Sequence, residues 1–255
     1  MTLAAALVLA GCQSRGASPI PEAHADPMPV ARAAGAVAVV ELFTSEGCSS
    51  CPPADDVLAD LATQRDVYAL SFQVDYWDDL GWPDRLASPE NTARQRAYAR
   101  AFGARGVYTP QMIVGGREQF VGSNRDRADV AVARALSAAP VVPLAVRARR
   151  LEGDSVAIDY TASGAPKGAV LDVAVVERAT STVVRAGENA GRTMKHANVV
   201  RTFSVVPLAS PTGSTVVHVP ASLRRQDGEI IAYAQAEATD GAGAPVLGAT
   251  SAPLP

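Results

Sequence analysis

Two cysteines three positions apart are the residues of this chain best suited to redox chemistry. Cys48 and Cys51 form a C-x-x-C motif with two serines between them, and Pro52 and Pro53 follow directly. Thiolates at this spacing can attack a substrate disulfide and then resolve the mixed disulfide that results. We therefore predict that Cys48 is the attacking thiol, at an exposed tip, and that Cys51 is the resolving thiol.

The same spacing also occurs in metal sites and in structural disulfides, so the motif alone leaves alternatives open. One alternative is a copper-binding metallochaperone whose two thiolates bind Cu(I), assisted by Met194 or His196. Another is a binding or scaffold protein in which the pair is a static disulfide. Met194 and His196 lack a third ligand, so we predict no metal site.

The residues around the motif predict a strand before the cysteines and a helix after them. Residues 37–43 form an apolar run rich in valine, which is typical of a buried parallel strand. After the two prolines, apolar residues recur at helical spacing, at Ala54, Val57, Leu58 and Leu61. Free N–H groups and the dipole at a helix N-terminus favour a thiolate over a thiol. This context favours redox chemistry for the pair.

Residues 36–138 are predicted to form one domain with the order strand, helix, strand, helix, strand, strand, helix. After the first strand, helices are predicted over 55–64, 89–102 and 124–137, and strands over 67–74, 112–114 and 119–121. Ser88 is an acceptable cap for the second helix, and Gly115 and Gly116 suit a hairpin turn.

This order, the C-x-x-C motif and the Thr109–Pro110 dipeptide resemble the thioredoxin fold. In that superfamily the residue matching Pro110 follows a cis peptide bond and faces the cysteine pair. The resemblance implies a catalytic role for Pro110 and substrate binding through the backbone of Thr109. It also implies a proton relay at Glu41, although the spacing to Cys48 is one residue longer than in thioredoxin. The alternative for Glu41 is a capped or solvent-facing carboxylate.

Three segments resemble a narrower family of exported bacterial proteins, known as domain of unknown function 1223. The segments are residues 43–53, 75–83 and 107–112, and the likeness extends through both predicted domains. Members of the family are grouped with thioredoxin-like proteins and have no settled activity. The resemblance therefore implies a fold more than a reaction.

The rest of the chain predicts a second domain made of strands alone. Residues 139–143 are read as a linker, and residues 144–255 contain short alternating runs separated by turn signals. The predicted fold class is an α/β thioredoxin-like domain followed by an all-β sandwich domain. Residues 187–196 are predicted to be a long polar connection that packs against the first domain or a partner.

The N-terminus resembles a bacterial signal peptide with a lipobox at residues 1–12, in which Cys12 would carry a lipid. Residues 13–35 would then form a flexible tether, and the protein would be a periplasmic, membrane-anchored lipoprotein. The alternative is an ordinary signal peptide with an incidental Cys12, since no Lys or Arg precedes the apolar run. If Cys12 is lipidated, Cys48 and Cys51 are the only remaining cysteines. They can pair with each other, and an oxidising compartment favours a chain without unpaired thiols.

Composition limits the range of partners. The formal net charge of −3 argues against a nucleic-acid partner. Three histidines are too few to favour a Ser/His/Asp hydrolase, and the chain has no Gly-rich phosphate loop. The function predicted from sequence is thiol–disulfide exchange with a protein or small-thiol substrate and an unidentified redox partner, without a cofactor.

Overall fold

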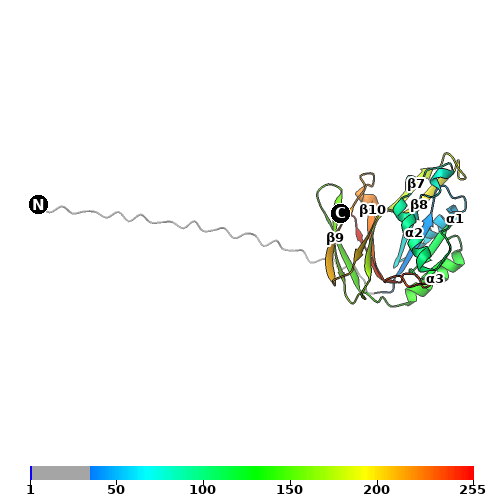
Figure 1. The fold of residues 1–255 in the computed structure, drawn as a ribbon. Coiled ribbons are helices and arrows are strands. Elements are labelled where there is room, and N and C mark those ends of the chain that lie inside the picture. The colour runs from blue at the N-terminus through cyan, green and yellow to red at the C-terminus, as the bar shows by residue number, and fades with distance from the viewer. Residues whose placement is uncertain (2–34) are drawn as a thin grey trace.

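A computed structural model describes Met1 and residues 35–255 (Figure 1). Apart from Met1, the predicted signal peptide lies outside the described residues, as do the lipobox Cys12 and almost all of the predicted tether. In the part of the chain that is described, no helix is long and apolar enough to cross a membrane.

The first half of the described chain has the strand and helix order predicted from sequence. Its elements are β1 (Ala38–Thr44), α1 (Pro52–Leu61), β2 (Val67–Gln73), the short 3-10 helix η1 (Asp78–Leu80), α2 (Pro89–Ala101), β3 (Gln111–Val114), β4 (Glu118–Val121) and α3 (Arg125–Ser137). β1 pairs in parallel with β2 and antiparallel to β3, which pairs with β4. Ser88 caps α2 by accepting a hydrogen bond from the backbone N–H of Asn91, as predicted.

The second half is built from strands and one 3-10 turn. Its elements are β5 (Leu144–Arg150), β6 (Ser155–Ala162), β7 (Val170–Val183), β8 (Thr193–Pro207), β9 (Thr212–His218), η2 (Arg225–Asp227), β10 (Gly228–Gln235) and β11 (Val246–Pro253). The prediction that residues 187–196 form a connection is wrong in part. Residues 193–196 belong to β8, because β7 extends far enough to pair with them.

The two halves share one mixed sheet, which gives the protein a sheet-rich α/β architecture with few helices. The eight-stranded sheet has the order β11-β10-β7-β8-β2-β1-β3-β4, and β5, β6 and β9 form a second sheet. The halves meet where Ser71 of β2 pairs with Val199 of β8. The predicted linker is packed into the structure, since Val142 is fully buried and its N–H donates to the carbonyl of Leu247.

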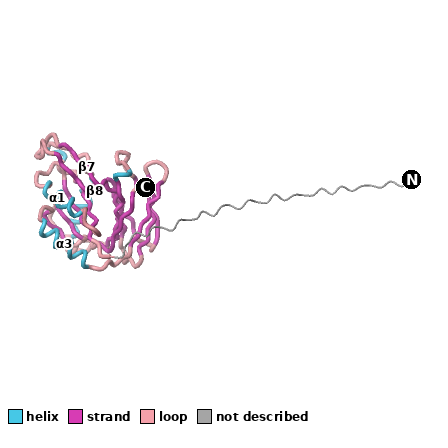
Figure 2. The backbone as a smooth tube through the Cα atoms, turned by 180° about the vertical axis from the view of Figure 1, so that it is seen from behind, coloured by secondary structure: helices cyan, strands magenta, loops and turns pink. Residues whose placement is uncertain are grey.

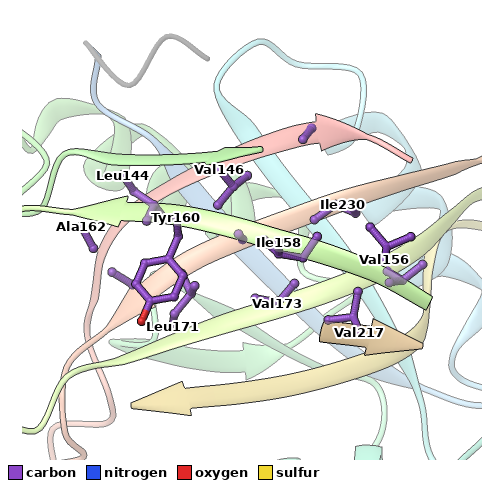
Figure 3. Packing of buried hydrophobic residues seen from close by; sticks show 14 of the residues in the cluster. Leu144, Val146, Val156, Ile158, Tyr160, Ala162, Leu171, Val173, Val217 and Ile230 are labelled. Atoms are coloured by element: carbon purple, nitrogen blue, oxygen red, sulfur yellow. The ribbon is translucent and has the colours of Figure 1, made fainter. Parts of the chain in front are cut away.

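Three apolar clusters fill the spaces between these layers. α1 and α3 cover one face of β1–β4, on the side of the molecule away from the three-stranded sheet (Figures 1 and 2). Side chains of the three-stranded sheet, such as Leu144 and Ile158, pack against side chains of β7, β10 and β11, such as Leu171 and Val173 of β7 (Figure 3). The third cluster contains Tyr98 of α2 and residues of both halves. The large sheet therefore curves around α2.

A buried arginine occupies the centre of this third cluster. Nε and Nη2 of Arg94 on α2 donate to the two carboxylate oxygens of Glu41 on β1, at 2.5 and 2.9 Å. Nη2 also lies 3.4 Å from Oδ2 of Asp172 on β7 and 2.8 Å from the hydroxyl of Tyr233 on β10. The guanidinium stacks over the ring of Phe203, 4.3 Å from its centroid. One side chain thus links four elements of the two halves.

The buried environment shifts the pKa values of charged groups in this cluster. Burial by itself would lower the pKa of Arg94, but the adjacent Glu41 raises it well above its ordinary value. Burial raises the pKa of Asp172 to about 7, although the charge of Arg94 acts in the opposite direction. Arg94 and Glu41 therefore form the closer ion pair, and Asp172 is a second acid whose pKa burial has raised toward neutral pH.

We expect Arg94→Met to lower the free energy of unfolding by about 3–5 kcal/mol, because it leaves Glu41 buried without its cation. Urea unfolding of the full chain measures this loss. The control is Arg125→Met, which breaks the exposed Arg125–Asp60 ion pair and is expected to cost less than about 1 kcal/mol. Equal losses in the two variants would contradict the central role of Arg94.

Candidate functional site

The two cysteines lie where β1 gives way to α1. Cys48 and Cys51 form a disulfide with their Cα atoms 5.4 Å apart. Cys51 is the N-cap residue of α1, and its carbonyl accepts hydrogen bonds from the backbone N–H groups of Ala54 and Asp55. The pair therefore sits at the positive end of the helix, as the sequence predicted.

The prediction of an exposed Cys48 is wrong. Both cysteines are fully buried, whereas Ser49 and Ser50 between them are exposed. The reason is that the connection between β7 and β8, residues 184–192, lies over the cysteine turn, so this polar segment packs against the first half, one of the two alternatives predicted for it. We call residues 184–192 the cap.

Two side chains bind the cap to the cysteine turn. The side-chain amide of Asn189, which is fully buried, donates to the carbonyls of Glu46 and Cys48, each at 2.9 Å. A carboxylate oxygen of Glu188 accepts a hydrogen bond from the backbone N–H of Ser49 at 3.2 Å. These contacts hold the cap on the turn, and they accompany the full burial of Cys48.

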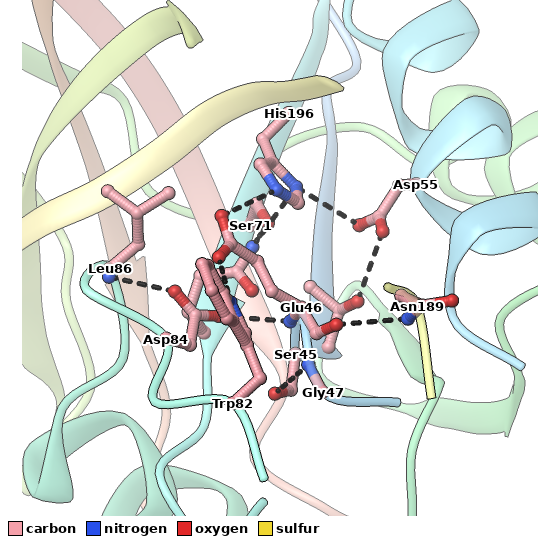
Figure 4. A network of polar contacts seen from close by, with 12 residues as sticks. Ser45, Glu46, Gly47, Asp55, Ser71, Trp82, Asp84, Leu86, Asn189 and His196 are labelled. Carbon is pink, nitrogen blue, oxygen red and sulfur yellow. Dashed lines mark hydrogen bonds and ion pairs between the residues drawn. The ribbon is translucent and has the colours of Figure 1, made fainter. Parts of the chain in front are cut away.

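Behind the turn, a histidine from the second half lies between two carboxyl groups of the first half (Figure 4). Nε2 of His196 on β8 is 3.5 Å from Glu46, and its Nδ1 is 3.8 Å from Asp55 on α1. These distances are too long for well-formed hydrogen bonds. Among the described residues, the Glu46 and Asp55 oxygens that face the imidazole and Nε2 of His196 have no hydrogen-bond partner, whereas Nδ1 lies 3.5 Å from the side-chain nitrogen of Gln73. The cluster thus has capacity for a further proton or bond.

The electrostatics of this cluster favour a protonated histidine. Burial would lower the pKa of His196, but Asp55 and Glu46 together raise it to about 10. Burial raises the pKa of Asp55, partly offset by His196. Burial acts in the same direction on Glu46, but the contacts from His196 and from the indole N–H of Trp82 leave its pKa below the ordinary value. A positive charge is therefore held one side chain away from the cysteine turn.

Asp55 is placed to act on Cys51. The two residues are four positions apart on α1, so their side chains lie on the same face of the helix. Both are buried, and the hydroxyl of Thr44 donates to the second oxygen of Asp55 at 3.3 Å. This spacing could have been read from the sequence, where Asp55 stands among the apolar positions of the predicted helix.

A second buried acid, Asp84, contacts the same turn from the loop after η1. Its two oxygens accept hydrogen bonds from the backbone N–H groups of Glu46 and Leu86, at 3.0 and 2.8 Å. Burial, together with the charge of Glu46, raises the pKa of Asp84 to about 6. Nothing in the sequence singles out this residue beyond its place in an acidic loop. Asp75 and Asp78 of that loop accept local hydrogen bonds from Thr92 and Asp84.

The structure does not bring Glu41 to the cysteines. Its neighbour Leu42 packs in the cluster that contains α1, whereas Glu41 binds Arg94 on the opposite face of the sheet. Successive strand residues point to opposite faces, so one additional residue before Cys48 is enough to turn this side chain away. Asp55 and His196 occupy the region where the relay was expected.

The Thr109–Pro110 dipeptide lies at the cysteine end of the sheet, and its peptide bond is cis, as the resemblance implied. The indole N–H of Trp77 donates to the hydroxyl of Thr109 at 2.9 Å, and Trp77 also lies against Gly47. A Cβ on Gly122 would lie 3.1 Å from the Cβ of Ala54 and 3.5 Å from that of Pro110. Pro110 is therefore close to the first turn of α1.

The structure provides no preformed metal centre in residues 35–255. No group of three or more His, Cys, Asp or Glu side chains in this range is arranged to hold a metal ion. Of the two residues considered as additional copper ligands, Met194 is buried and His196 is engaged by carboxyl groups.

Residues 39–235 match the protein family described as a protein of unknown function, DUF1223. The chain belongs to this family. Its structure is similar to the crystal structure of protein AGR_C_4864 from Agrobacterium tumefaciens, with a TM-score of 0.64 and 35% identity. That match covers 85% of this chain and 94% of the other chain.

A second solved structure shares the fold of this DUF1223 protein. HBP35 of Porphyromonas gingivalis gives a TM-score of 0.62 at 12% identity, with 86% of this chain and 76% of the other chain covered. No curated protein matches the sequence.

We expect the free energy of unfolding to fall by about 1.4 kcal/mol per pH unit between pH 7.5 and 9.5, because of His196. Its raised pKa, about 10, means that the folded protein retains a proton that the unfolded chain loses near pH 6.5. The stabilisation is complete below pH 6.5 and disappears as the pH passes 10. Asp172 and Asp84, with pKa values of about 7 and 6, titrate below this window.

Urea unfolding at several pH values measures this slope. His196→Gln is expected to flatten it, and His218→Gln, at an exposed histidine of β9, is the matched control and is expected to leave it unchanged. A wild-type stability that is constant across the window would show that His196 is neutral in the folded protein.

We expect Asn189→Ala to accelerate reduction of the disulfide by dithiothreitol about tenfold, because two buried hydrogen bonds of the cap are lost. Thiol labelling of the native protein over time gives the rate. Asn198→Gly is the control: it removes a bond from β8 to Ala69 on β2, not to the cysteine turn, and Gly readily adopts the positive φ of 47° at this position. If both variants are reduced at the same rate, general destabilisation and not the cap limits access.

Proposed function

We propose that this DUF1223 protein carries out thiol–disulfide exchange through Cys48 and Cys51. The observation that carries the proposal is a buried acid, Asp55, four residues after Cys51 on α1 and facing the buried His196, with the oxygen that faces the imidazole not hydrogen-bonded among the described residues. Burying titratable groups is costly, and a purely structural disulfide has no use for them. Exchange needs a group that can take and return the proton of a thiol.

The proposal also includes a fold for each half of the chain. A parallel β1/β2 pair, the cysteines at the start of α1, and the cis Thr109–Pro110 bond at the same end support a thioredoxin-like domain over residues 36–138. The packing of the three-stranded sheet on β7, β10 and β11 supports a β-sandwich over residues 144–255. In this arrangement Pro110 lies beside the reacting sulfurs, and the backbone of Thr109 pairs with the substrate chain.

The reaction has two displacement steps. In the reduced protein, the thiolate of Cys48 attacks one sulfur of a substrate disulfide, the substrate S–S bond breaks, and one substrate thiolate leaves. Cys51 then gives its proton to Asp55 and attacks the sulfur of Cys48, which releases the second substrate thiolate and forms the internal disulfide. Two electrons pass from the cysteine pair to the substrate, and the reverse sequence oxidises a substrate dithiol.

The charged groups have distinct roles in these steps. A raised pKa suits Asp55 to accept a proton from a thiol. The imidazolium of His196 keeps the carboxylate form of Asp55 from being isolated in the interior. Asp55 thus takes the proton-relay role that the resemblance to thioredoxin implied for Glu41.

The compartment, the redox partner and the substrate class are predicted from the sequence alone. Export to the periplasm and a lipid on Cys12 would place the pair in an oxidising compartment, where a redox partner restores the active form. The substrate is a protein or a small thiol, and it must displace the cap before it meets Cys48.

A glutathione exchange assay on the reduced full chain tests the proposal. We expect Cys51→Ser to accumulate a mixed disulfide between glutathione and Cys48, detected by mass spectrometry. We expect Asp55→Asn to slow the second step at least about tenfold and to change its pH profile. The exposed neighbour variant Asp56→Asn is the matched control and should react like the wild type.

One observation favours a second candidate function, a binding or scaffold protein with a structural disulfide. Cys48 is fully buried, which would protect a static disulfide. A reduction potential below about −300 mV and no exchange with glutathione would select this function. A higher potential, together with the trapped intermediate in Cys51→Ser, would select exchange.

A further inference from the structure

A groove runs between α2 and the strands of the second half, away from the cysteine turn. Its volume is about 520 Å³, within the range of pockets that hold small molecules. Its walls are mainly apolar: Ala93 and Ala97 line it from α2, and Val170, Phe203 and Val205 line it from β7 and β8. Val205 is 53% exposed, so the groove leaves apolar surface in contact with water.

Arg94 lies at the base of this groove and has unused hydrogen-bonding capacity. Its hydrogen bonds to Glu41, Asp172 and its other neighbours come from Nε and Nη2. Within residues 35–255, no hydrogen bond from Nη1 is found. The side chain keeps 11% of its surface accessible and is part of the groove lining. The groove therefore offers N–H donors of a cation at the end of an apolar channel.

The balance of charge around Arg94 permits an anion to approach under mildly acidic conditions. Glu41 faces it from β1 and Asp172 from β7, and the hydroxyls of Tyr98 and Tyr233 and the side-chain oxygen of Gln235 also accept hydrogen bonds from it. Burial raises the pKa of Asp172 to about 7, so near neutral pH this acid is partly protonated. Glu41 alone then balances Arg94, and a ligand carboxylate meets no second negative charge at the base.

The open side of the groove is acidic and therefore disfavours an anionic group. Glu90 and Glu237 line it and are exposed. A ligand with a second anionic group at its far end would be repelled there. The two ends of the groove therefore select for one carboxylate at the base and an uncharged body.

We propose that this groove binds a monocarboxylate with an apolar body, whose carboxylate contacts Arg94 and whose body lies against α2 and Phe203. Nothing in this proposal depends on the chemistry of the cysteines. The ligand class follows from one free cationic edge, apolar walls and acidic side chains at the open side.

Isothermal titration calorimetry of the full chain with octanoate tests the proposal. We expect octanoate to bind at least about tenfold more tightly than octylammonium, which has the wrong charge, or octanedioate, which has a second carboxylate. We also expect the affinity for octanoate to rise about tenfold from pH 8 to pH 6, because binding requires a protonated Asp172.

A groove-filling variant locates the site. Arg94 is left intact because it also holds the two halves together, so the test uses Ala97→Trp, at an exposed position in the groove wall. This variant is expected to weaken octanoate binding at least about tenfold. Arg96→Trp, on an exposed part of α2 outside the groove, is the control and should bind like the wild type.

Four results would each overturn the proposal: no binding of octanoate at millimolar concentration, equal affinity for octylammonium, unchanged binding in Ala97→Trp, or an affinity that does not rise toward pH 6. The first three would show that Arg94 and the groove do not form the site. The last would show that charge at Asp172 does not control it.

Discussion

The burial of one guanidinium group between two halves of the chain is the interaction on which the rest of the structure depends. Removing Arg94 from water is unfavourable unless its charge is paired, and its partners come from β1, α2, β7 and β10. These partners can meet around one side chain only if the large sheet curves around α2. The same curvature brings the hairpin of β7 and β8 to the cysteine end. Arg94 thereby joins the two halves that together form a site it does not touch.

The candidate site is assembled from both halves, with different contributions from each. The first half provides the disulfide, the helix N-terminus and Asp55, which are all local to one strand–helix junction. The second half provides His196 and the cap, both from the β7–β8 hairpin. One element thus supplies both the positive charge behind the cysteines and the cover in front of them. A movement of the hairpin would change access to the sulfurs and their electrostatic surroundings together.

The sequence was informative wherever structure is determined by neighbouring residues. The capping Ser88, the parallel strand at 67–74 and the cysteines at a helix start all follow from local patterns, and the structure contains them. The failures concern contacts between distant residues. The burial of Cys48 depends on Asn189, which lies 141 positions away, and the sheet that joins the halves depends on the pairing of β2 with β8. Neither contact leaves a signal in hydrophobic periodicity.

The β-bulge in the β7–β8 ladder has a consequence for how this chain can vary in length. The register shifts between Val175 and Val176, and beyond this point the hairpin continues to its tip with His196 facing Thr180. Side chains alternate between the two faces of a strand. An insertion or deletion of one residue between the bulge and His196 would turn the imidazole away from Glu46 and Asp55, whereas a change of two residues would preserve its face. Relatives that retain this cluster should therefore vary in this segment by even numbers of residues, with odd changes confined to the tip.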